Sequence, residues 1–321
     1  MTKDGPRLVG PSEFEQALAE LHAATLDPQA GLFGPQSMLW RVDQDAAIFL
    51  GAGRALLLQL AHPWVAAAIT DHSRSLTDPF GRFHRTFRIV FTIVFGTRDQ
   101  ALAAARRLYR LHTTITGTVP ARSGRFAAGS AYHANEEEAL RWVHATLIET
   151  AILARAIVRP PLTSAELERY WQDGRRFAAL FGIRDETLPP DWAGFMAYNR
   201  AMWASDTLVV TPEARAIADA LWSGAGTWLR VPRWYRRLTA HMLPSSLRAP
   251  FGFAPADYDE ARAARITTWV RGAYPWIPSR LRLVGPYQEA RGRLAGRAEP
   301  AWMVRRLNRF WIGQPAMPAP R

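Results

Sequence analysis

The sequence contains no cysteine and a single lysine, Lys3. Without cysteine the chain forms no disulfide, zinc–thiolate site or iron–sulfur cluster, holds no thiolate-ligated haem and has no cysteine nucleophile. Any bound metal therefore sits on histidine or carboxylate ligands.

Long uninterrupted apolar runs are also missing. The most apolar stretches are 46–69, which polar residues interrupt, and 87–95, which is too short to span a bilayer. Both are typical of buried helices, and their apolar character leaves peripheral contact with a membrane surface open. No apolar segment follows the basic N-terminal residues as in a secretory signal, so we expect no transmembrane segment and a cytoplasmic location.

No glycine-, serine- or proline-rich linker divides the chain of 321 residues, of which 48% are hydrophobic. We therefore expect one domain over 1–321, with an ordered core over about 12–312. The net charge of +12 comes almost entirely from arginines. Because these are scattered beside Glu and Asp rather than gathered in a tail, they indicate solvated faces and ion pairs, and we expect no nucleic-acid partner.

The periodicity of the sequence is helical almost throughout. Ser12 is expected to cap a first helix, Thr163 and Glu166 form a capping box, and a third helix runs from Thr211-Pro212 to Gly224. The segment 87–95 is rich enough in β-branched and aromatic residues for a strand, but its helical neighbours favour a helix. Further helices are expected over 37–52, 54–70, 79–95, 98–117, 135–158, 191–206, 256–272, 286–295 and 299–311. The fold class predicted is all-α, a single orthogonal helical domain of about ten helices with a ligand pocket between central helices.

Several catalytic signatures are absent. The chain has no Gly-x-Ser-x-Gly elbow, no Walker loop and no Gly-x-Gly-x-x-Gly fingerprint, which argues against common hydrolases, kinases and dinucleotide enzymes. It also has no Glu-x-x-His motif, which a carboxylate-bridged di-iron site would need on two helices.

His112 is the strongest of the eight histidines as a candidate ligand. It shares one helical stripe with Ala105, Leu108, Tyr109, Ile115 and Thr116, so its imidazole is expected to point into the core. A buried neutral imidazole needs partners for its nitrogens, and iron is one solution. A hydrogen bond to a carbonyl is the alternative.

Three other histidines receive weaker interpretations. His144 is also expected on an inward helical face and is the second choice for a ligand. His62 precedes Pro63, which interrupts the helix, and a structural role is favoured there. His72 is expected at a polar helix end.

An ordered set of motifs resembles the family that includes bacterial latex-clearing proteins and the fungal MpaB oxygenase. The motifs run in order over about 33–150, with weaker similarity to about 240. They are 33–41, 56–63 with 71–73, 78–86, 95–97, 111–112 with Gly117, and 132–135 leading to 142–146.

The resemblance implies an all-α protein that holds haem b on a helical histidine and uses dioxygen to cleave an isoprenoid double bond. It makes His112 the axial iron ligand. It also implies that Arg82, Arg85 and Thr86 line the distal and propionate region as catalytic residues, with Arg85 where latex-clearing proteins carry a lysine. An arginine stays protonated, so Arg85 can donate hydrogen bonds but cannot act as a base.

We assign Arg107, Arg110 and Thr116 to cofactor binding as well. These two arginines and their neighbour Arg106 would pair with the haem propionates, and a solvated face is the alternative for all three.

The expected activity is a haem b-dependent oxygenase acting with dioxygen on a hydrophobic small molecule. Rubber itself is not the expected substrate, because no secretion signal is found. A haem carrier or gas sensor and a haem peroxidase are the alternatives.

Overall fold

Helices make up almost all of the regular structure. The computed structural model describes residues 6–72, 79–224 and 231–320, and the strands in those ranges are β1 (Thr116–Thr118) and β2 (Ala131–His133). They pair antiparallel, with Gly117 opposite Tyr132. The predicted all-α class is confirmed, and the extent of the domain stays a prediction.

The helices follow one another along the chain. They are α1 (Pro11–Ala24), α2 (Met38–Asp43), α3 (Ala52–Leu60), α4 (Pro63–His72), α5 (Pro79–Phe95), α6 (Arg98–Thr113), α7 (Glu137–Val158), α8 (Ser164–Ala179), α9 (Trp192–Ala204), α10 (Pro212–Ser223), α11 (Arg233–Met242), α12 (Ser245–Arg248), α13 (Glu260–Ala273), α14 (Ser279–Arg282), α15 (Gly285–Leu294) and α16 (Trp302–Ile312). Four 3₁₀ turns join them: η1 (Ala46–Gly51), η2 (Asp185–Thr187), η3 (Pro255–Asp257) and η4 (Tyr274–Trp276).

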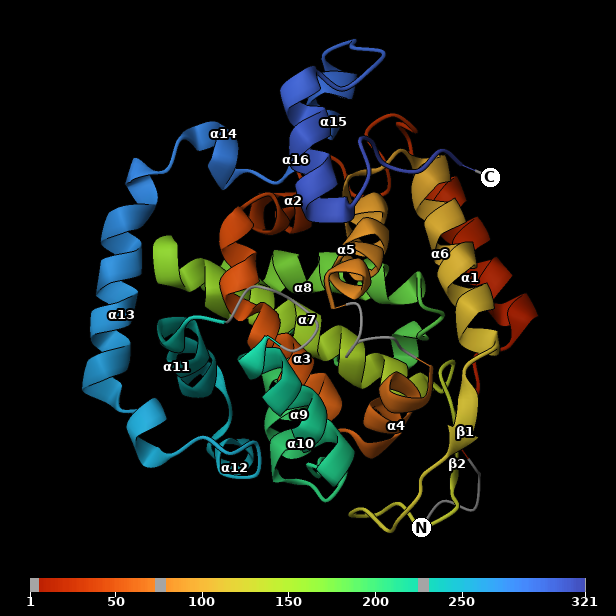
Figure 1. The fold of residues 1–321 in the computed structure, drawn as a ribbon. Helices are drawn as coiled ribbons and strands as arrows, with labels where there is room; N and C mark the ends of the chain where they lie inside the picture. The colour runs from red at the N-terminus through yellow and green to blue at the C-terminus, as the bar shows by residue number, and fades with distance from the viewer. Residues whose placement is uncertain (1–5, 73–78, 225–230, 321) are drawn as a thin grey trace.

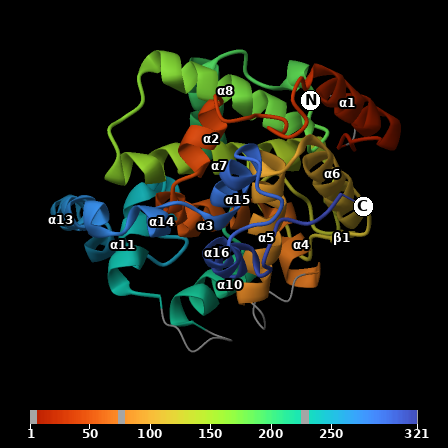
Figure 2. The ribbon, with the colours of Figure 1, turned by 90° about the horizontal axis from the view of Figure 1, so that it is seen from above.

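Helix α7 lies at the centre of the molecule. It packs against η1, α3, α2, α8 and α13. Helices α5 and α6 pack side by side, and α15 and α16 cover α5 (Figure 1). Seen from above, α13 and α1 lie at opposite edges of the molecule (Figure 2). The segment that carries His112 is therefore on the α1 side, where α6 ends at the small sheet.

The predicted helix over 54–70 is two helices. The chain bends by 102° between the Ala46–Leu60 and Pro63–His72 segments, because Pro63 has no N–H with which to continue the helical ladder. Among the described residues no single helix is long and apolar enough to cross a membrane, and only this bent pair reaches that length and composition together.

The prediction of one helix over 98–117 is wrong at its C-terminal end. Helix α6 ends at Thr113, where the N–H of Thr114 bonds back to the carbonyls of His112 and Leu111. Three β-branched residues and Gly117 follow directly, and this composition favours extended chain over helix. Ile115 and Thr116 therefore leave the helical stripe of His112, and Thr116 becomes the first residue of β1.

Other boundaries differ in smaller ways. The first helix begins at Pro11, not after Ser12, because proline fits the first helical position, and no side chain caps it. Segment 37–52 is divided into α2 and η1, with the Asp45 carboxylate accepting from the N–H of Ala47. Helices α11, α12 and α14 and the two strands were not predicted.

Several local predictions are confirmed. The segment 87–95 lies within α5, and Thr163 and Glu166 form the predicted capping box. Helix α10 begins after Thr211 and ends at Gly224, whose φ of 72° is the left-handed conformation that glycine adopts without strain.

Three tryptophans anchor the core. Trp40, Trp142 and Trp171 are the largest fully buried side chains, and each indole N–H donates to a distant carbonyl. The acceptors are Val94 at 2.7 Å, Leu58 at 2.9 Å and Pro189 at 2.9 Å. Each indole is thus buried without leaving a polar atom unpaired.

A buried ion pair joins α3 to α7. Arg54 is 1% exposed, and its guanidinium lies 2.7 Å from the carboxylate of Glu149. It also donates to the hydroxyl of Thr150 at 2.6 Å and to the carbonyl of Met242 at 2.8 Å. Because charges are costly to bury, these contacts fix the relative positions of α3, α7 and the end of α11.

We predict that Arg54→Met lowers the free energy of unfolding by about 3–5 kcal/mol, because it leaves the buried Glu149 carboxylate without its cation. The double variant Arg54→Met/Glu149→Leu should recover most of the loss, as measured by urea unfolding. Arg305→Met is the matched control, since it removes an exposed pair with Glu299 at 3.3 Å. A double variant no more stable than Arg54→Met would contradict the prediction.

Candidate functional site

His112 lies in the last turn of α6, half-buried against the rest of the protein. Burial lowers the pKa of His112 to about 4, with a further lowering from the neighbouring His133 and an opposing hydrogen bond to the side chain of Asn135. The ring is therefore neutral at pH 7. A neutral imidazole has one N–H and one nitrogen with a free lone pair, which is the form that binds a metal.

The predicted stripe of inward-facing side chains on α6 is present in the structure as far as His112. Ala105 is fully buried, and Tyr109 stacks on Phe14 with ring centroids 4.4 Å apart. The hydroxyl of Tyr109 donates to the carbonyl of Val9 at 2.9 Å. Thr116 is exposed in β1, and its carbonyl lies 2.9 Å from Nε2 of His72.

The strands bring a distant segment to the end of α6. The N–H of Ala134 donates to the carbonyl of Ile115 at 3.0 Å, next to the β1–β2 pairing. The hydroxyl of Tyr132 donates to Asp71 of α4 at 2.6 Å. A Cβ on Gly117 would clash with this hydroxyl and with the ring that carries it, so the close approach favours glycine. Asn135 is thereby placed beside His112.

Arginines of α5 and α6 gather in one basic cluster. Burial, together with Arg85, lowers the pKa of Arg82 to about 10. Burial lowers the pKa of Arg88 as well, with Arg107 of α6 and Arg85 contributing. We call Arg82, Arg85, Arg88 and Arg107 the basic cluster.

The sequence interpretation missed Arg88, although its spacing of three residues from Arg85 and six from Arg82 was a usable signal. The guanidinium of Arg88 also donates to the carbonyl of Ile312 at 3.0 Å, which ties α5 to α16. Arg85 and Thr86 are exposed on α5.

The neighbouring arginines of α6 point elsewhere. Arg106 binds Glu15 of α1 at 2.8 Å, and Arg110 also helps to lower the pKa of Glu15. The structure therefore places Arg107 in the basic cluster. Arg106 instead forms an ion pair with Glu15 of α1, and Arg110 contributes to the lowered pKa of the same residue.

His144 has a structural environment. Its Nε2 lies 2.8 Å from the carbonyl oxygen of Gly174, and its ring packs against Trp171 and Phe177. Burial lowers its pKa to about 4. The bond to Gly174 holds the ring between α7 and α8, while its Nδ1 is buried without a hydrogen-bond partner among the described residues.

His62 is also part of the core. It is 1% exposed and packs against Phe126 with ring centroids 5.2 Å apart. Burial, with Arg125 adding to the effect, lowers its pKa to about 3. Its Nδ1 is buried without a hydrogen-bond partner among the described residues, so the structural role of His62 stays a prediction.

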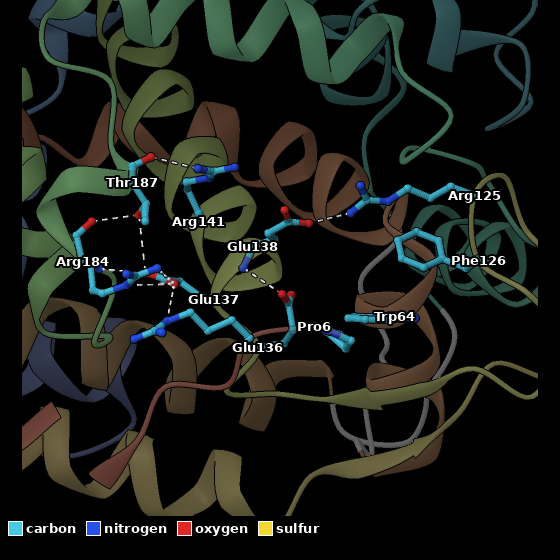
Figure 3. A pocket seen from close by; sticks show the side chains of 11 residues that line it. Pro6, Trp64, Arg125, Phe126, Glu136, Glu137, Glu138, Arg141, Arg184 and Thr187 are labelled. Atoms are coloured by element: carbon cyan, nitrogen blue, oxygen red, sulfur yellow. Dashed lines mark hydrogen bonds and ion pairs between the residues drawn. The ribbon is translucent and has the colours of Figure 1, made fainter. Parts of the chain in front are cut away.

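A polar hollow of about 420 Å³ lies at the N-terminal end of α7 (Figure 3). Its charged groups pair with one another: Arg125 with Glu138 at 2.7 Å, and Arg184 with Glu137 at 2.9 Å. Glu136 caps α7, and burial raises its pKa to about 7. These ion pairs and the helix cap hold neighbouring segments of the chain together. The hollow is therefore polar and structural, not an apolar substrate pocket.

A second hollow of about 560 Å³ lies between α1 and α6, lined among others by Leu18, His22, Leu102 and Arg106. Neither of these two hollows is lined by His112 or Arg82. Within the described ranges no three His, Asp or Glu side chains gather to hold a metal ion. A haem iron makes a smaller demand, since its porphyrin leaves only one or two axial positions for protein ligands.

These observations define an all-α protein with a neutral histidine at the end of α6 and an arginine cluster on α5 and α6. A family model described as "ER-bound oxygenase mpaB/B'/Rubber oxygenase, catalytic domain" matches residues 40–272. The chain belongs to this family and is an oxidoreductase of the oxygenase type. Searches of curated proteins and of solved structures return no significant match.

We predict that the His112 imidazole of the protein without cofactor titrates with a pKa of about 4. The unfolded chain takes up this proton near pH 6.5, so the stabilising contribution of neutral His112 is complete above that pH and is lost as the pH falls toward 4. A ¹⁵N NMR titration of the histidine rings measures this value directly. A pKa near that of free histidine would mean that the ring is solvated.

Proposed function

We propose that this protein is a haem b-dependent oxygenase in which His112 is the axial iron ligand and a hydrophobic small molecule is the substrate. The observation that carries the proposal is the neutral His112 ring, which keeps a lone pair available in a chain of this oxygenase family. When bound, haem supplies the activation of dioxygen, and the protein supplies ligation, polarity and access.

The residues of the site fit such a group. Haem b carries two propionates, and the guanidinium groups of the basic cluster are donors of the kind that bind carboxylates. Arg107 of α6 and Arg88 of α5 act on each other, so guanidinium groups of both helices lie in one region. The cofactor role of Arg110 and Thr116 receives no comparable support, because Arg110 acts on Glu15 and Thr116 is exposed in β1.

Arg85 and Thr86 are proposed as hydrogen-bond donors near bound dioxygen or a propionate. A guanidinium does not lose its proton in a protein, so Arg85 donates and does not accept a proton from substrate. Proton abstraction by this residue is thus excluded from the proposed reaction, which weakens the transfer of the rubber-cleavage mechanism to this protein. Oxidative cleavage of a carbon–carbon double bond is one reaction to test with an isoprenoid-like substrate.

We predict that purified protein supplied with haem shows a Soret band and a haem b pyridine spectrum, and that His112→Ala loses most of the haem because the iron loses its protein ligand. Added imidazole should restore part of the Soret absorption of His112→Ala. The exposed His241 provides the matched control, His241→Ala. A protein that stays colourless while retaining its helical circular dichroism would refute the proposal.

We predict that Arg107→Met weakens haem binding by about 10- to 100-fold, which corresponds to the loss of one charge-assisted hydrogen bond. The neighbouring variant Arg106→Met should not, since Arg106 pairs with Glu15 on another face of α6. Haem affinity by absorbance titration compares the two. Equal effects of the two variants would show that Arg107 is a solvated residue.

A haem carrier, a gas sensor and a peroxidase share the same iron ligand and stay alternatives. Oxygen uptake with isoprenoid compounds, followed by detection of carbonyl products, separates an oxygenase from a carrier or sensor. Hydrogen peroxide consumption identifies a peroxidase. A cytoplasmic location is also a proposal, which cell fractionation tests, and peripheral membrane contact would appear in the same experiment.

A further inference from the structure

We infer that the edge of the molecule formed by α13, η4 and α14 binds an anionic lipid surface. Helices α13 and α14 follow this edge (Figure 1). It lies on the side away from α1, so the inference depends neither on haem nor on the oxygenase reaction (Figure 2). The side chains that carry the inference are all exposed, and we call them the Trp–Arg surface: Arg262, Arg265, Trp269, Trp276, Ile277, Arg280 and Leu281.

Large apolar side chains are exposed together on this edge. Trp276 is 88% exposed, Trp269 62%, Leu281 50% and Ile277 40%. A single exposed apolar residue is ordinary in a folded protein, but several that follow one another along one edge form a patch, and such patches mark contacts with another surface. Removing these side chains from water would favour association.

The backbone beneath this patch is tied to the core. Arg271 of α13 donates to the carbonyl of Ile157 in α7 at 3.0 Å. Tyr274 is buried at the end of α13, and its hydroxyl donates to the carboxylate of Asp45. The exposed side chains therefore belong to an ordered part of the fold and not to a loose chain end.

Two prolines flank the most exposed tryptophan. Trp276 and Ile277 lie between Pro275 and Pro278, and each proline restricts its own φ and the conformation of the residue before it. The N–H of Ile277 donates to the carbonyl of Tyr274 at 3.2 Å, which closes η4. A surface that is ordered before it binds loses less conformational entropy on binding.

The charge around the apolar side chains has one sign. Residues 261–288 contain five arginines and no aspartate or glutamate. Arg262, Arg265 and Trp269 are spaced by three and four residues, so they share one exposed face of α13. Arg280 precedes the exposed Leu281 in α14. The edge therefore combines tryptophans and aliphatic side chains with positive charge.

Anionic lipid headgroups fit this combination. Tryptophan is enriched at the bilayer interface because its ring is apolar and its N–H is polar, and arginines near an anionic leaflet are attracted to its phosphates. A second copy of this chain would bring the same arginines against each other in a symmetric contact, where like charges repel. Nucleic acid would pair with the arginines, but Ile277 and Leu281 have no ring on which a base can stack.

The first experiment measures flotation of the full-length protein with vesicles. Vesicles of phosphatidylcholine with phosphatidylglycerol should bind it, and vesicles of phosphatidylcholine alone should bind it much more weakly. Trp276→Ser should weaken binding to the mixed vesicles by about tenfold or more, because it removes the most exposed apolar side chain. Trp302→Ser is the matched control, since Trp302 is 62% exposed on α16 and outside the Trp–Arg surface.

The second experiment tests the charges. Arg265→Gln and Arg280→Gln should each weaken binding to the mixed vesicles about fivefold at low salt and leave binding to phosphatidylcholine unchanged. Added salt should remove the difference because it screens the attraction. Arg305→Gln is the control, since it removes a charge from α16 that pairs with Glu299 at 3.3 Å. Circular dichroism checks that each variant is folded.

Three results would overturn the inference. The first is a protein that floats with neither kind of vesicle. The second is binding to mixed vesicles that Trp276→Ser and Arg280→Gln weaken no more than their controls do, because the attraction would then come from the net charge of the whole protein. The third is a dimer or an RNA complex that these variants abolish while vesicle binding is unchanged, since the surface would then belong to that partner.

Discussion

The buried contact between Arg54 and Glu149 is the constraint on which the arrangement of the central helices depends. Neither charge is stable in the core without the other, and the remaining donors of Arg54 reach Thr150 and the carbonyl of Met242. Helices α3 and α7 are therefore fixed against each other along their length. Because α7 is the central helix, the elements that pack on it inherit this arrangement.

The candidate site depends on that arrangement through two connections. At the end of α3, Pro63 turns the chain by 102° into α4, which packs against both strands and accepts a hydrogen bond from Tyr132 at Asp71. At the start of α7, Asn135 and Glu136 join the strands to the central helix. His112 thus lies where the end of α6 meets a sheet that is held by α4 and α7.

The electrostatics of α5 and α6 support the proposal of an anionic, metal-bearing cofactor. Burial keeps His112 neutral, which preserves its lone pair, while the basic cluster keeps its charge. The two features suit opposite parts of one group: a metal needs a neutral nitrogen donor, and carboxylates need cations. In the proposed function Arg85 is a donor that stays protonated, so the proposal assigns the chemistry to the cofactor rather than to a protein base.

The sequence by itself determined the helical class, the buried face of α6 up to His112 and most helix starts, because these follow from local periodicity and from caps such as Thr163 and Glu166. Ordered motifs were enough to indicate the oxygenase family. Only the tertiary structure decided that α6 ends at Thr113, that Arg107 and Arg106 face different partners, and that Asn135 meets His112. The physical reason is that these contacts join residues 19 to 91 positions apart, and a helical period records only neighbours within a few turns.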